Sequence, residues 1–346
     1  MMMLPKVCIC IPCYNNEDTI ERTLKSILEQ TYKNYDVVIV DNCSTDDTID
    51  RINKVISDYE DFVGKVKIII NDKNIGASNN WNKCIENSYG DYMCLYHADD
   101  VYLPTIVEKQ VSYMIEHLDV GIVFVNAYII DSEDNIVSEH KVPLKYVNEG
   151  ILGFEDICEC LINDGHIMMP PSGMYRISAL RKYNYHFSGK YKYGFDTDFF
   201  IEMGKKHRLA FLNEKLMKYR LYNSASESYR VVLRYKHTLH DDFIATINNH
   251  IIKEDMIYKL DSLEYISLYN KGIKEKMIKA FINGDYTYAK KMLNKFDSRL
   301  PYKKLWIWKL VLNFGLPQIV RKYMAYKRYK NFFRGNFDNI KLEIEE

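Results

Sequence analysis

Short apolar runs alternate with amphipathic segments over the first 125 residues, and this alternation limits the possible folds more than any other feature of the sequence. Apolar residues dominate the runs that we predict to be strands, at residues 7–11, 37–40, 66–70, 92–96 and 121–125. Between them, apolar side chains recur every three or four residues, as at Ile20, Leu24 and Ile27, which is typical of helices packed on one face. This order predicts an α/β fold with a doubly wound, mostly parallel sheet, whose ligand crevice lies at the carboxyl ends of the strands.

The pattern changes after Asn126. Short strands are expected at residues 128–131 and 136–139, and short helices at residues 154–163 and 196–205, as additions at one edge of the sheet. From residue 229 onward only helices are expected, at residues 231–252, 256–269, 274–283 and 286–296. We therefore predict an α/β domain over residues 1–228 and a helical C-terminal region over residues 229–346.

Charge and cysteine content narrow the classes of function. The 47 Lys and Arg residues balance the 47 Asp and Glu residues, so the whole chain has no net attraction for nucleic acid. We find no secretory signal and no apolar run of about 20 residues, and we expect a cytoplasmic or membrane-peripheral protein. Cys8, Cys10 and Cys13 alternate with apolar residues, which indicates a buried strand, and their C-x-x-C pair lacks the second pair of a zinc site.

Polar residues follow three of the predicted strands, at the edge where a ligand would bind. These clusters are residues 12–15, 41–44 and 97–100. Asp41 or Asn42 can accept a hydrogen bond from the N–H of a nucleobase. Asp99 and Asp100 can hold a hard divalent cation that neutralises a diphosphate. Because neither G-x-G-x-x-G nor G-x-x-x-x-G-K-[ST] occurs, the pattern favours a nucleotide-sugar site over a dinucleotide site or a Walker site.

On these residues the chain resembles the family 2 glycosyltransferases of GT-A fold, over about residues 5–228. The ordered motifs that carry the resemblance are Cys10-Ile11-Pro12-Cys13-Tyr14-Asn15, Val38-Ile39-Val40-Asp41-Asn42-Cys43-Ser44-Thr45-Asp46-Asp47-Thr48, Asn74-Ile75-Gly76, Tyr89-Gly90-Asp91-Tyr92, Ala98-Asp99-Asp100, Gly194-Phe195-Asp196 and Tyr219-Arg220-Leu221-Tyr222. The resemblance implies an inverting enzyme that moves a sugar from a nucleotide-diphosphate donor, expected to be a UDP-sugar, to a glycan or lipid-linked acceptor. It also implies a Mn²⁺ or Mg²⁺ ion and a role in the synthesis of bacterial surface polysaccharide, lipooligosaccharide or glycoprotein glycan.

The resemblance also implies a role for each motif. Asp99 and Asp100 are the expected metal ligands, and Arg220 is expected to contact the diphosphate. Asp196 is the expected general base, which deprotonates the acceptor hydroxyl. The residues expected to contact the nucleotide sugar are Pro12, Tyr14, Asn15, Asp41, Asn42, Asn74, Gly76, Asp99, Arg220 and Tyr222. Residues 168–174 are expected to form a loop that closes the site against water.

Three positions depart from the family pattern. His97 stands where the first Asp of the metal motif is usual, so the metal is expected on the two later carboxylates alone. Phe195 replaces a Glu directly before the predicted base. Tyr222 replaces a His and leaves a neutral donor for a phosphate oxygen, so the diphosphate is expected to depend more on Arg220.

Each assignment has a structural alternative. Asp41 could cap the helix that follows it, and Asp196 could be the N-cap of its own helix. Asp198 could be the base in place of Asp196. Arg220 could be a surface residue of a strand.

Two other functions fit parts of the pattern. A non-catalytic nucleotide-sugar or glycan-binding module would explain His97 and Phe195 as marks of lost turnover, but the carboxylates at 99, 100 and 196 are retained. A sugar nucleotidyltransferase shares the sheet and the carboxylates, but it usually has a glycine-rich and basic loop after the first strand, which residues 12–17 lack. We therefore favour the glycosyltransferase.

Residues 299–337 form a basic aromatic segment. Ten cations and no acidic residue lie between Asp297 and Asp338, interleaved with Trp, Tyr, Phe and Leu residues. Helices of such composition lie on anionic membrane surfaces, so we expect the segment to bind the inner face of the cell membrane. A packed helix with a solvated basic face is the alternative, and nucleic acid is not expected because no nucleic-acid-binding motif accompanies the segment.

Overall fold

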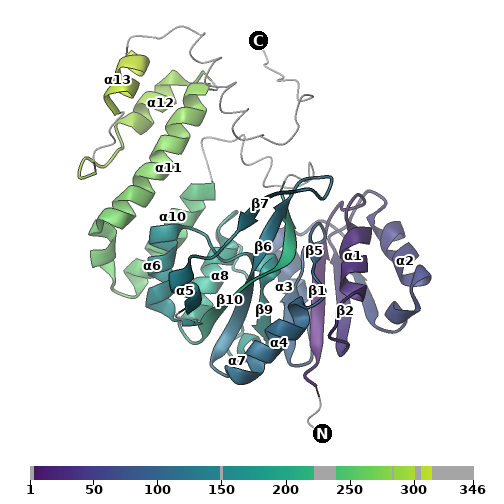
Figure 1. Ribbon diagram of the computed structural model, residues 1–346. Coiled ribbons are helices and arrows are strands. Elements are labelled where there is room, and N and C mark those ends of the chain that lie inside the picture. The colour runs from purple at the N-terminus through teal and green to yellow at the C-terminus, as the bar shows by residue number, and fades with distance from the viewer. Residues whose placement is uncertain (1–3, 149–150, 222–238, 283, 301–304, 314–346) are drawn as a thin grey trace. The chain divides into compact units, whose positions relative to one another are not determined.

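The computed structural model describes residues 4–148, 151–221, 239–282, 284–300 and 305–313. Contacts divide the chain into two compact units (Figure 1). The described residues before 226, together with residues 242–255, form the first unit. Residues 239–241 and those from 256 onward belong to the second unit.

The first unit is built on a sheet whose strands follow the order β3-β2-β1-β4-β9-β6-β10-β5 within the described chain, with β7 paired to β6 and β8 paired to β10. The strands are β1 (Val7–Cys13), β2 (Tyr35–Asp41), β3 (Val66–Ile70), β4 (Tyr92–Leu95), β5 (Val101–Tyr102), β6 (Val120–Ile130), β7 (Ile136–His140), β8 (Ile151–Leu152), β9 (Met174–Arg176) and β10 (Arg208–Arg220). Strands β3, β2, β1 and β4 are parallel, and β6 is parallel to β10. Strand β9 joins the two groups because it is antiparallel to both β4 and β6. The predicted α/β class with a mostly parallel sheet is confirmed.

Helices cover both faces of this sheet. They are α1 (Ile20–Leu28), α2 (Thr48–Asp58), α3 (Ala77–Asn87), α4 (Ile106–Glu116), α5 (Leu144–Asn148), α6 (Phe154–Asp164), α7 (Ile177–Lys182), α8 (Phe195–Gly204) and α10 (Leu239–Lys253), with short 3₁₀ turns η1 (Glu60–Phe62) and η2 (Pro170–Ser172). The chain steps from β1 to β2 to β3 in one direction and then returns to β4 on the other side of β1. Because such crossovers are right-handed, α1 and α2 cover one face and α3 covers the other (Figure 1).

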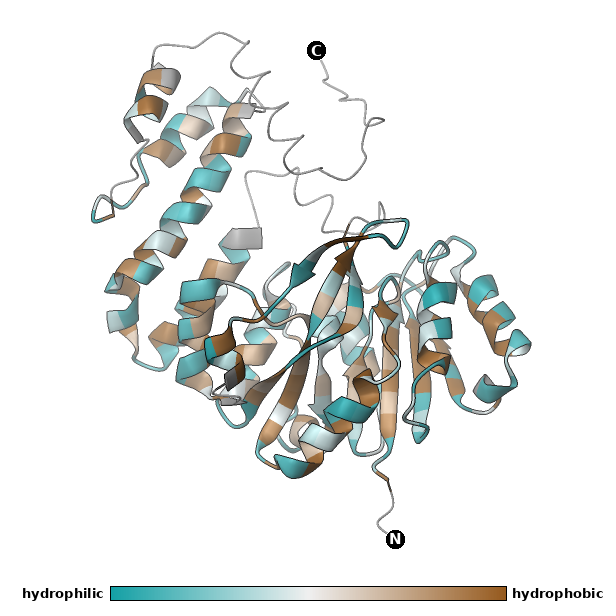
Figure 2. Cartoon of the chain, in the orientation of Figure 1, coloured by the Kyte–Doolittle hydropathy of each residue, from teal (hydrophilic) through white to brown (hydrophobic). Residues whose placement is uncertain are grey.

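Strand β1 shows how the strand period builds the core. Every residue of β1 is buried, as expected for a strand with helices on both sides. Ile9 and Ile11 join the same apolar cluster as Leu24 of α1. On the opposite face the thiol of Cys10 lies 3.5 Å from the backbone carbonyl of Cys84 in α3. The N-terminal cysteines therefore fill the core, and Figure 2 shows that apolar residues also predominate along the central strands of the sheet, whereas β7 is mostly hydrophilic.

Two strand predictions needed correction. Residues 121–125 and 128–131 were predicted as separate strands, but β6 is continuous through them. The polar residue between them, Asn126, does not interrupt the strand because its amide is satisfied: Nδ2 donates to Asn213 Oδ1 at 3.0 Å, and Oδ1 accepts from the N–H of Val142 at 2.9 Å. Strand β10 was not predicted at all. Its pairing with β6 shifts register on both sides of Lys215, so its apolar residues keep no simple alternation.

The second unit is helical over its described residues. It contains η3 (Ile257–Asp261), α11 (Leu263–Ile282), α12 (Tyr286–Leu293) and α13 (Leu305–Asn313). The helices predicted at 256–269 and 274–283 form one helix, α11, whose buried Met277 and Phe281 share an apolar cluster with Trp308 of α13. The predicted domain boundary at 228/229 lies outside the described residues, and it stays a prediction. No described helix is both long enough and apolar enough to cross a bilayer.

Candidate active site

Asn15 connects the loop after β1 to the loop after β2 through hydrogen bonds. Its backbone has φ of 53°, a left-handed conformation that asparagine tolerates better than most residues. In this conformation its N–H donates to Ser44 Oγ at 2.9 Å, and its side-chain oxygen accepts from the N–H of Thr45 at 2.9 Å. Asn15 therefore acts in this structure as a connector between two of the predicted binding loops.

Asp41, at the end of β2, is buried and hydrogen-bonded locally. Its Oδ2 accepts from the N–H of Ser44 at 2.9 Å, and its Oδ1 accepts from the hydroxyl of Ser44 and from the thiol of Cys13. These bonds close the turn after β2, but Asp41 does not cap α2, whose N-cap residue is Asp47. A contact between Asp41 and a nucleobase stays a prediction.

Asn42, Asn74 and Gly76 are brought together by one hydrogen-bond network. Asn42 Oδ1 accepts from the N–H of Ile75 at 2.9 Å, and Asn42 Nδ2 donates to Asn74 Oδ1 at 3.0 Å. The same Asn74 oxygen accepts from the N–H of Gly76 at 2.9 Å. Gly76 has φ of +82° directly before α3, a conformation that favours glycine. Three predicted nucleotide contacts thus form one rigid corner after β2 and β3.

Pro12 marks the point where the sheet opens. The pairing of β1 with β4 ends at Cys10, whose carbonyl accepts from the N–H of Tyr96, whereas the pairing with β2 continues to Cys13. Successive residues of a strand direct their backbone N–H and C=O groups to alternate neighbours, so Pro12 has the same orientation as Cys10, toward β4. Strand β4 has already ended at this point, and the sheet loses no hydrogen bond because proline has no N–H. Tyr14, the next predicted contact after this opening, is 42% exposed.

The loop after β4 is held by backbone contacts from α1 and β10. The hydroxyls of Thr19 and Thr23 both donate to the carbonyl of Ala98 at 3.0 Å, and Thr23 also donates to the carbonyl of Asp100 at 2.8 Å. Arg220, the last residue of β10, donates from its N–H to Asp100 Oδ1 at 2.8 Å. The loop is therefore fixed before any ligand binds.

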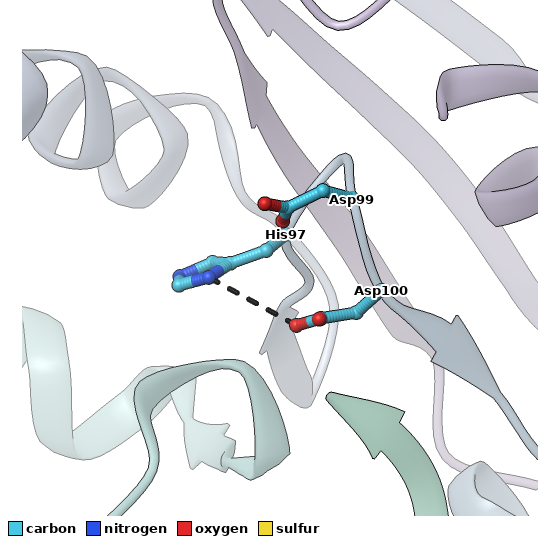
Figure 3. A group of neighbouring side chains, drawn as sticks. All are labelled: His97, Asp99 and Asp100. Atoms are coloured by element: carbon cyan, nitrogen blue, oxygen red, sulfur yellow. Dashed lines mark ion pairs between the residues drawn. The ribbon is translucent and has the colours of Figure 1, made fainter. Parts of the chain in front are cut away.

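Three side chains of this loop form a cluster suited to a cation (Figure 3). One ligand atom from each of His97, Asp99 and Asp100 lies within 4.8 Å of the others. Asp100 is fully buried, and within the described chain neither its Oδ2 nor His97 Nε2 has a hydrogen-bond partner. Unsatisfied buried polar atoms are rare and need an explanation, and a metal ion would provide one here.

The ionisation of the cluster follows from its burial. Burial raises the pKa of Asp99 to about 6, although the charge of Arg220 opposes the shift. Burial raises the pKa of Asp100 well above its usual value, and the negative charge of Asp99 raises it further. Burial lowers the pKa of His97 to about 4, so its imidazole is neutral at pH 7 and free to bind a metal. These donors fit a divalent cation, whose charge would offset the repulsion between the carboxylates.

Asp196 lies in the first turn of α8, where the helix dipole favours an anion. His166 Nε2 lies 3.3 Å from its Oδ2, and the N–H of Thr197 donates to its Oδ1 at 2.7 Å. Burial alone would raise the pKa of Asp196, but the charge and hydrogen bond of His166 outweigh it and hold the pKa below its usual value. Trp81 connects Asp196 to the loop after β4, because its ring centroid lies 5.1 Å from that of His97 and 5.0 Å from that of Phe195, the residue directly before Asp196.

Asp198, the alternative base, points away from this group. Two residues correspond to about 200° of rotation along a helix, so Asp196 and Asp198 lie on opposite sides of α8. Asp198 is buried and accepts from the hydroxyl of Ser188 at 2.6 Å, and it lies 2.8 Å from His250 Nε2 of α10. Its contacts are those of a residue that fastens α10 to α8.

Arg220 is buried, which contradicts the alternative of a surface strand residue. Its Nε donates to the carbonyl of Asp99 at 2.8 Å, its Nη1 donates to the carbonyl of Asp131 at 2.7 Å, and its Nη2 meets the carboxylate of Asp134. These bonds connect the loop after β4, residues 97–100, to the turn between β6 and β7. The predicted contact with a diphosphate stays a prediction, and Tyr222 lies outside the described residues.

Sequence reasoning missed two features of the site. His166 belongs to no recognisable sequence motif, and it lies beside Asp196 only because of how the chain folds before η2. His97 was left out of the predicted metal ligands because it departs from the family pattern, but one of its ring nitrogens lies within 4.8 Å of carboxylate oxygens of Asp99 and Asp100. The predicted closing segment, residues 168–174, contains η2 and the first residue of β9, and Met168 and Ser172 are fully buried. Its closure over the site stays a prediction.

Comparisons with known proteins agree with this geometry. The family model described as Glycosyl transferase family 2 matches residues 8–184. An uncharacterized glycosyltransferase of Methanocaldococcus jannaschii is 30% identical over 222 residues, which are 63% of this chain and 72% of the relative. The UDP-Glc:alpha-D-GlcNAc-diphosphoundecaprenol beta-1,3-glucosyltransferase WfaP of Escherichia coli is 36% identical over 108 residues, which are 31% of this chain and 41% of the relative.

A solved structure shares the fold. The mannosyltransferase PcManGT of Pyrobaculum calidifontis, in complex with GDP-Man and Mn²⁺, matches with a TM-score of 0.56 and 14% identity, over 97% of this chain and 89% of that one. The predicted GT-A type of sheet domain is thereby confirmed.

Proposed function

Because the chain belongs to glycosyl transferase family 2, we propose that it transfers a sugar from a nucleotide-diphosphate donor to a hydroxyl group of a glycan or lipid-linked acceptor, with inversion at the anomeric carbon. The observation that carries the proposal is the cluster of His97, Asp99 and Asp100 after β4, which Trp81 connects to the first turn of α8, where Asp196 lies. Burial raises the pKa of Asp99 and Asp100 and so disfavours their charged forms unless a cation is bound, whereas the lowered pKa of Asp196 keeps its carboxylate ionised.

The donor would lie with its diphosphate at the loop after β4. Asp99 and Asp100 would hold a divalent cation there, whose charge would stabilise the departing nucleoside diphosphate. The base and ribose would lie over the corner formed by Asn42, Asn74 and Gly76, with Tyr14 exposed beside it. The Escherichia coli relative is named for UDP-Glc, which supports UDP as the nucleotide of this chain.

Asp196 would act as the base. Its pKa is held below its usual value, so the carboxylate is ionised at neutral pH. Trp81 contacts both His97 of the proposed cation site and Phe195 beside Asp196, so the base would lie near the departing diphosphate. His166 would orient the carboxylate, and it also limits the basicity of Asp196 because it lowers the pKa. We infer that the proton transfers late, once the acceptor oxygen has begun to bond to the anomeric carbon and has become acidic.

The proposed acceptor and location rest on a relative and on the C-terminal segment. The Escherichia coli relative is named for an acceptor on diphosphoundecaprenol, which supports a lipid-linked acceptor in surface polysaccharide synthesis here. Helix α13 leads into the C-terminal part of the basic aromatic segment, and it exposes Trp306 and Leu310. We propose that this segment binds the anionic inner face of the membrane, where such an acceptor would be presented.

One experiment separates this function from its alternatives. The full-length chain is incubated with Mn²⁺, a membrane extract as the acceptor and one of several donors: UDP-Glc, UDP-GlcNAc, UDP-Gal or GDP-Man. Sugar transfer releases a nucleoside diphosphate, whereas nucleotidyl transfer releases pyrophosphate, and a binding module releases neither. We expect the nucleoside diphosphate with one donor, together with a product of inverted anomeric configuration by NMR. Pyrophosphate release, or donor binding without turnover, would refute the proposal.

A further inference from the structure

We propose that His97 is a third metal ligand, and that it makes the cation site of this chain a nitrogen–oxygen site that selects Mn²⁺ over Mg²⁺. The inference rests on the proposed function only in placing the cation at this loop. The two carboxylates alone would form an all-oxygen site, which suits Mg²⁺ as well as Mn²⁺. An imidazole ligand shifts the balance toward transition metals.

The geometry of the cluster carries the assignment. The three ligand atoms lie within 4.8 Å of one another, and His97 Nδ1 lies 4.0 Å from Asp100 Oδ2. Two ligands at about 2.2 Å from a shared cation are at most about 4.4 Å apart, so a small rotation of the side chains would complete the site. Figure 3 shows the imidazole of His97 and the carboxylate of Asp100 directed toward the same space.

One buried atom of the cluster lacks the partner that a purely structural role would supply. Asp100 is completely buried, one of its oxygens accepts from Arg220, and its Oδ2 meets no donor among the described residues. The nitrogen that faces this oxygen is His97 Nδ1, and at 4.0 Å it is too far away for a hydrogen bond. A shared cation would give both atoms a partner, as most buried polar groups have.

The surroundings hold His97 in place. Its backbone N–H donates to the hydroxyl of Tyr102 at 2.7 Å, and its ring lies against Trp81 with centroids 5.1 Å apart. Trp81 in turn contacts Phe187 and Phe195 edge-on. These aromatic contacts restrict the imidazole to a small range of orientations, as residues around a metal ligand commonly do. They also explain why an aromatic residue, Phe195, occupies the position where a Glu is usual, since Phe195 packs against Trp81.

The test uses Mn²⁺ itself as a spectroscopic probe. Metal-free full-length protein is titrated with Mn²⁺, with and without UDP, and bound Mn²⁺ is examined by electron spin echo modulation. We expect nitrogen-14 coupling from a directly bound imidazole in the wild type, and its loss in His97→Asp. His97→Ala should weaken Mn²⁺ binding by at least about tenfold, and Asp100→Asn should weaken both Mn²⁺ and Mg²⁺. His186→Ala, which changes an exposed histidine, is the matched control and should change neither.

The selectivity gives a second readout that does not depend on activity. His97→Asp restores an all-oxygen site, so the ratio of the Mg²⁺ and Mn²⁺ dissociation constants should fall by about tenfold or more. An unchanged ratio, bound Mn²⁺ without nitrogen coupling in the wild type, or no Mn²⁺ binding in either condition would each overturn the inference. Nitrogen coupling in a protein that transfers no sugar would support the inference and contradict the proposed function instead, so the two failures are distinguishable.

Discussion

At the scale of single residues, Asp196 combines a lowered pKa with a position next to Phe195, which shares contacts with Trp81 and so lies near the proposed cation site. Asp196→Asn keeps the shape of the side chain but cannot take a proton, so turnover should fall by about 100-fold or more. The affinity for the donor should stay within about twofold, because a base touches the acceptor and not the nucleotide. Steady-state kinetics together with calorimetry of donor binding measures both quantities.

Asp198→Asn is the matched control for that experiment. It lies on the opposite side of α8 and should leave the turnover of the folded enzyme largely intact. Normal turnover in Asp196→Asn, with turnover lost in Asp198→Asn, would move the base two residues along the helix.

Asp99 and Asp100 should make the metal-free protein sensitive to pH. Burial raises the pKa of Asp99 to about 6, so the folded state holds its proton more tightly than the unfolded state does. The stability gained in this way is present below pH 4, the range of an ordinary Asp, and is lost as the pH rises through about 6. The melting temperature of protein in EDTA should therefore fall over this range.

The same measurement on Asp100→Asn isolates the repulsion between the two carboxylates. This variant should lose less stability as the pH rises, because a neutral amide replaces the second charge. Addition of Mn²⁺ at pH 7.5 should raise the melting temperature of the wild type and not that of Asp100→Asn. Equal pH profiles for the two proteins would show that the carboxylates do not interact.

At the scale of elements, α10 returns from the helical region of the sequence to pack on α8. Residues 242–255 belong to the first unit, although sequence reasoning assigned them to the helical C-terminal region. The N–H of Tyr193 donates to Asp242 Oδ2 at 2.8 Å, and a Cβ at Gly194 would approach Thr246 Oγ1 within 2.9 Å. Helix α10 therefore contacts Tyr193 and Gly194, in the chain before Asp196.

The pair of Asp198 and His250 fastens this contact, so Asp198→Asn should cost about 1 to 3 kcal/mol in the free energy of unfolding at pH 7. Hydrogen bonds and charge from His250 and Ser188 hold the pKa of Asp198 below its usual value against the effect of burial. Its contribution is therefore present above the pKa of an unfolded Asp, about 3.9, and is lost as the pH falls below it. Urea denaturation should show the gap between wild type and variant closing below pH 4. A gap of constant size would mean that packing, and not the ion pair, causes the loss.

At the scale of the whole molecule, charge is unevenly distributed, because the basic aromatic segment is strongly cationic although the formal net charge of the chain is zero. Six of its ten cations follow Asn313, and they are Arg321, Lys322, Lys327, Arg328, Lys330 and Arg334. Changing these six residues to Gln in the full chain should abolish binding to anionic vesicles, because each cation contributes about 1 kcal/mol at such a surface. Co-sedimentation with phosphatidylglycerol vesicles at low salt measures the binding, and phosphatidylcholine vesicles are the control. Wild-type protein that ignores both kinds of vesicle would refute the membrane proposal.

This variant is preferable to a chain that ends at Asp297. Helix α13 places Trp308 and Leu312 in the apolar cluster of the second unit, so removal of residues after Asp297 would also remove part of that core. Substitution of the six cations keeps α13 and its apolar residues in the chain. Lost binding can then be attributed to charge.

Sequence patterns by themselves determined the parts of this protein that depend on near neighbours in the chain. The period of two in β1 and the helical spacing of α1 follow from local geometry, and so does the position of polar residues at the ends of β1, β2 and β4. Because parallel strands have their carboxyl ends at one edge of the sheet, the sequence alone predicts that the binding loops after these strands lie together. The pairing of Asp99 with Asp100 needed no tertiary information, since the two residues are adjacent.

Only the tertiary structure decided which distant residues complete those loops. Strand β10 was missed because its bulges break the alternation of apolar residues, yet it delivers Arg220 to the carbonyl of Asp99. His166 reaches Asp196 through packing that no spacing in the chain encodes, and it sets the ionisation of the proposed base. Burial raises the pKa of Asp99 and lowers that of His97, and burial is a property of the assembled core. The sequence therefore determined which groups could do the chemistry, whereas desolvation and long-range contacts, which exist only in the folded chain, decided their charges and partners.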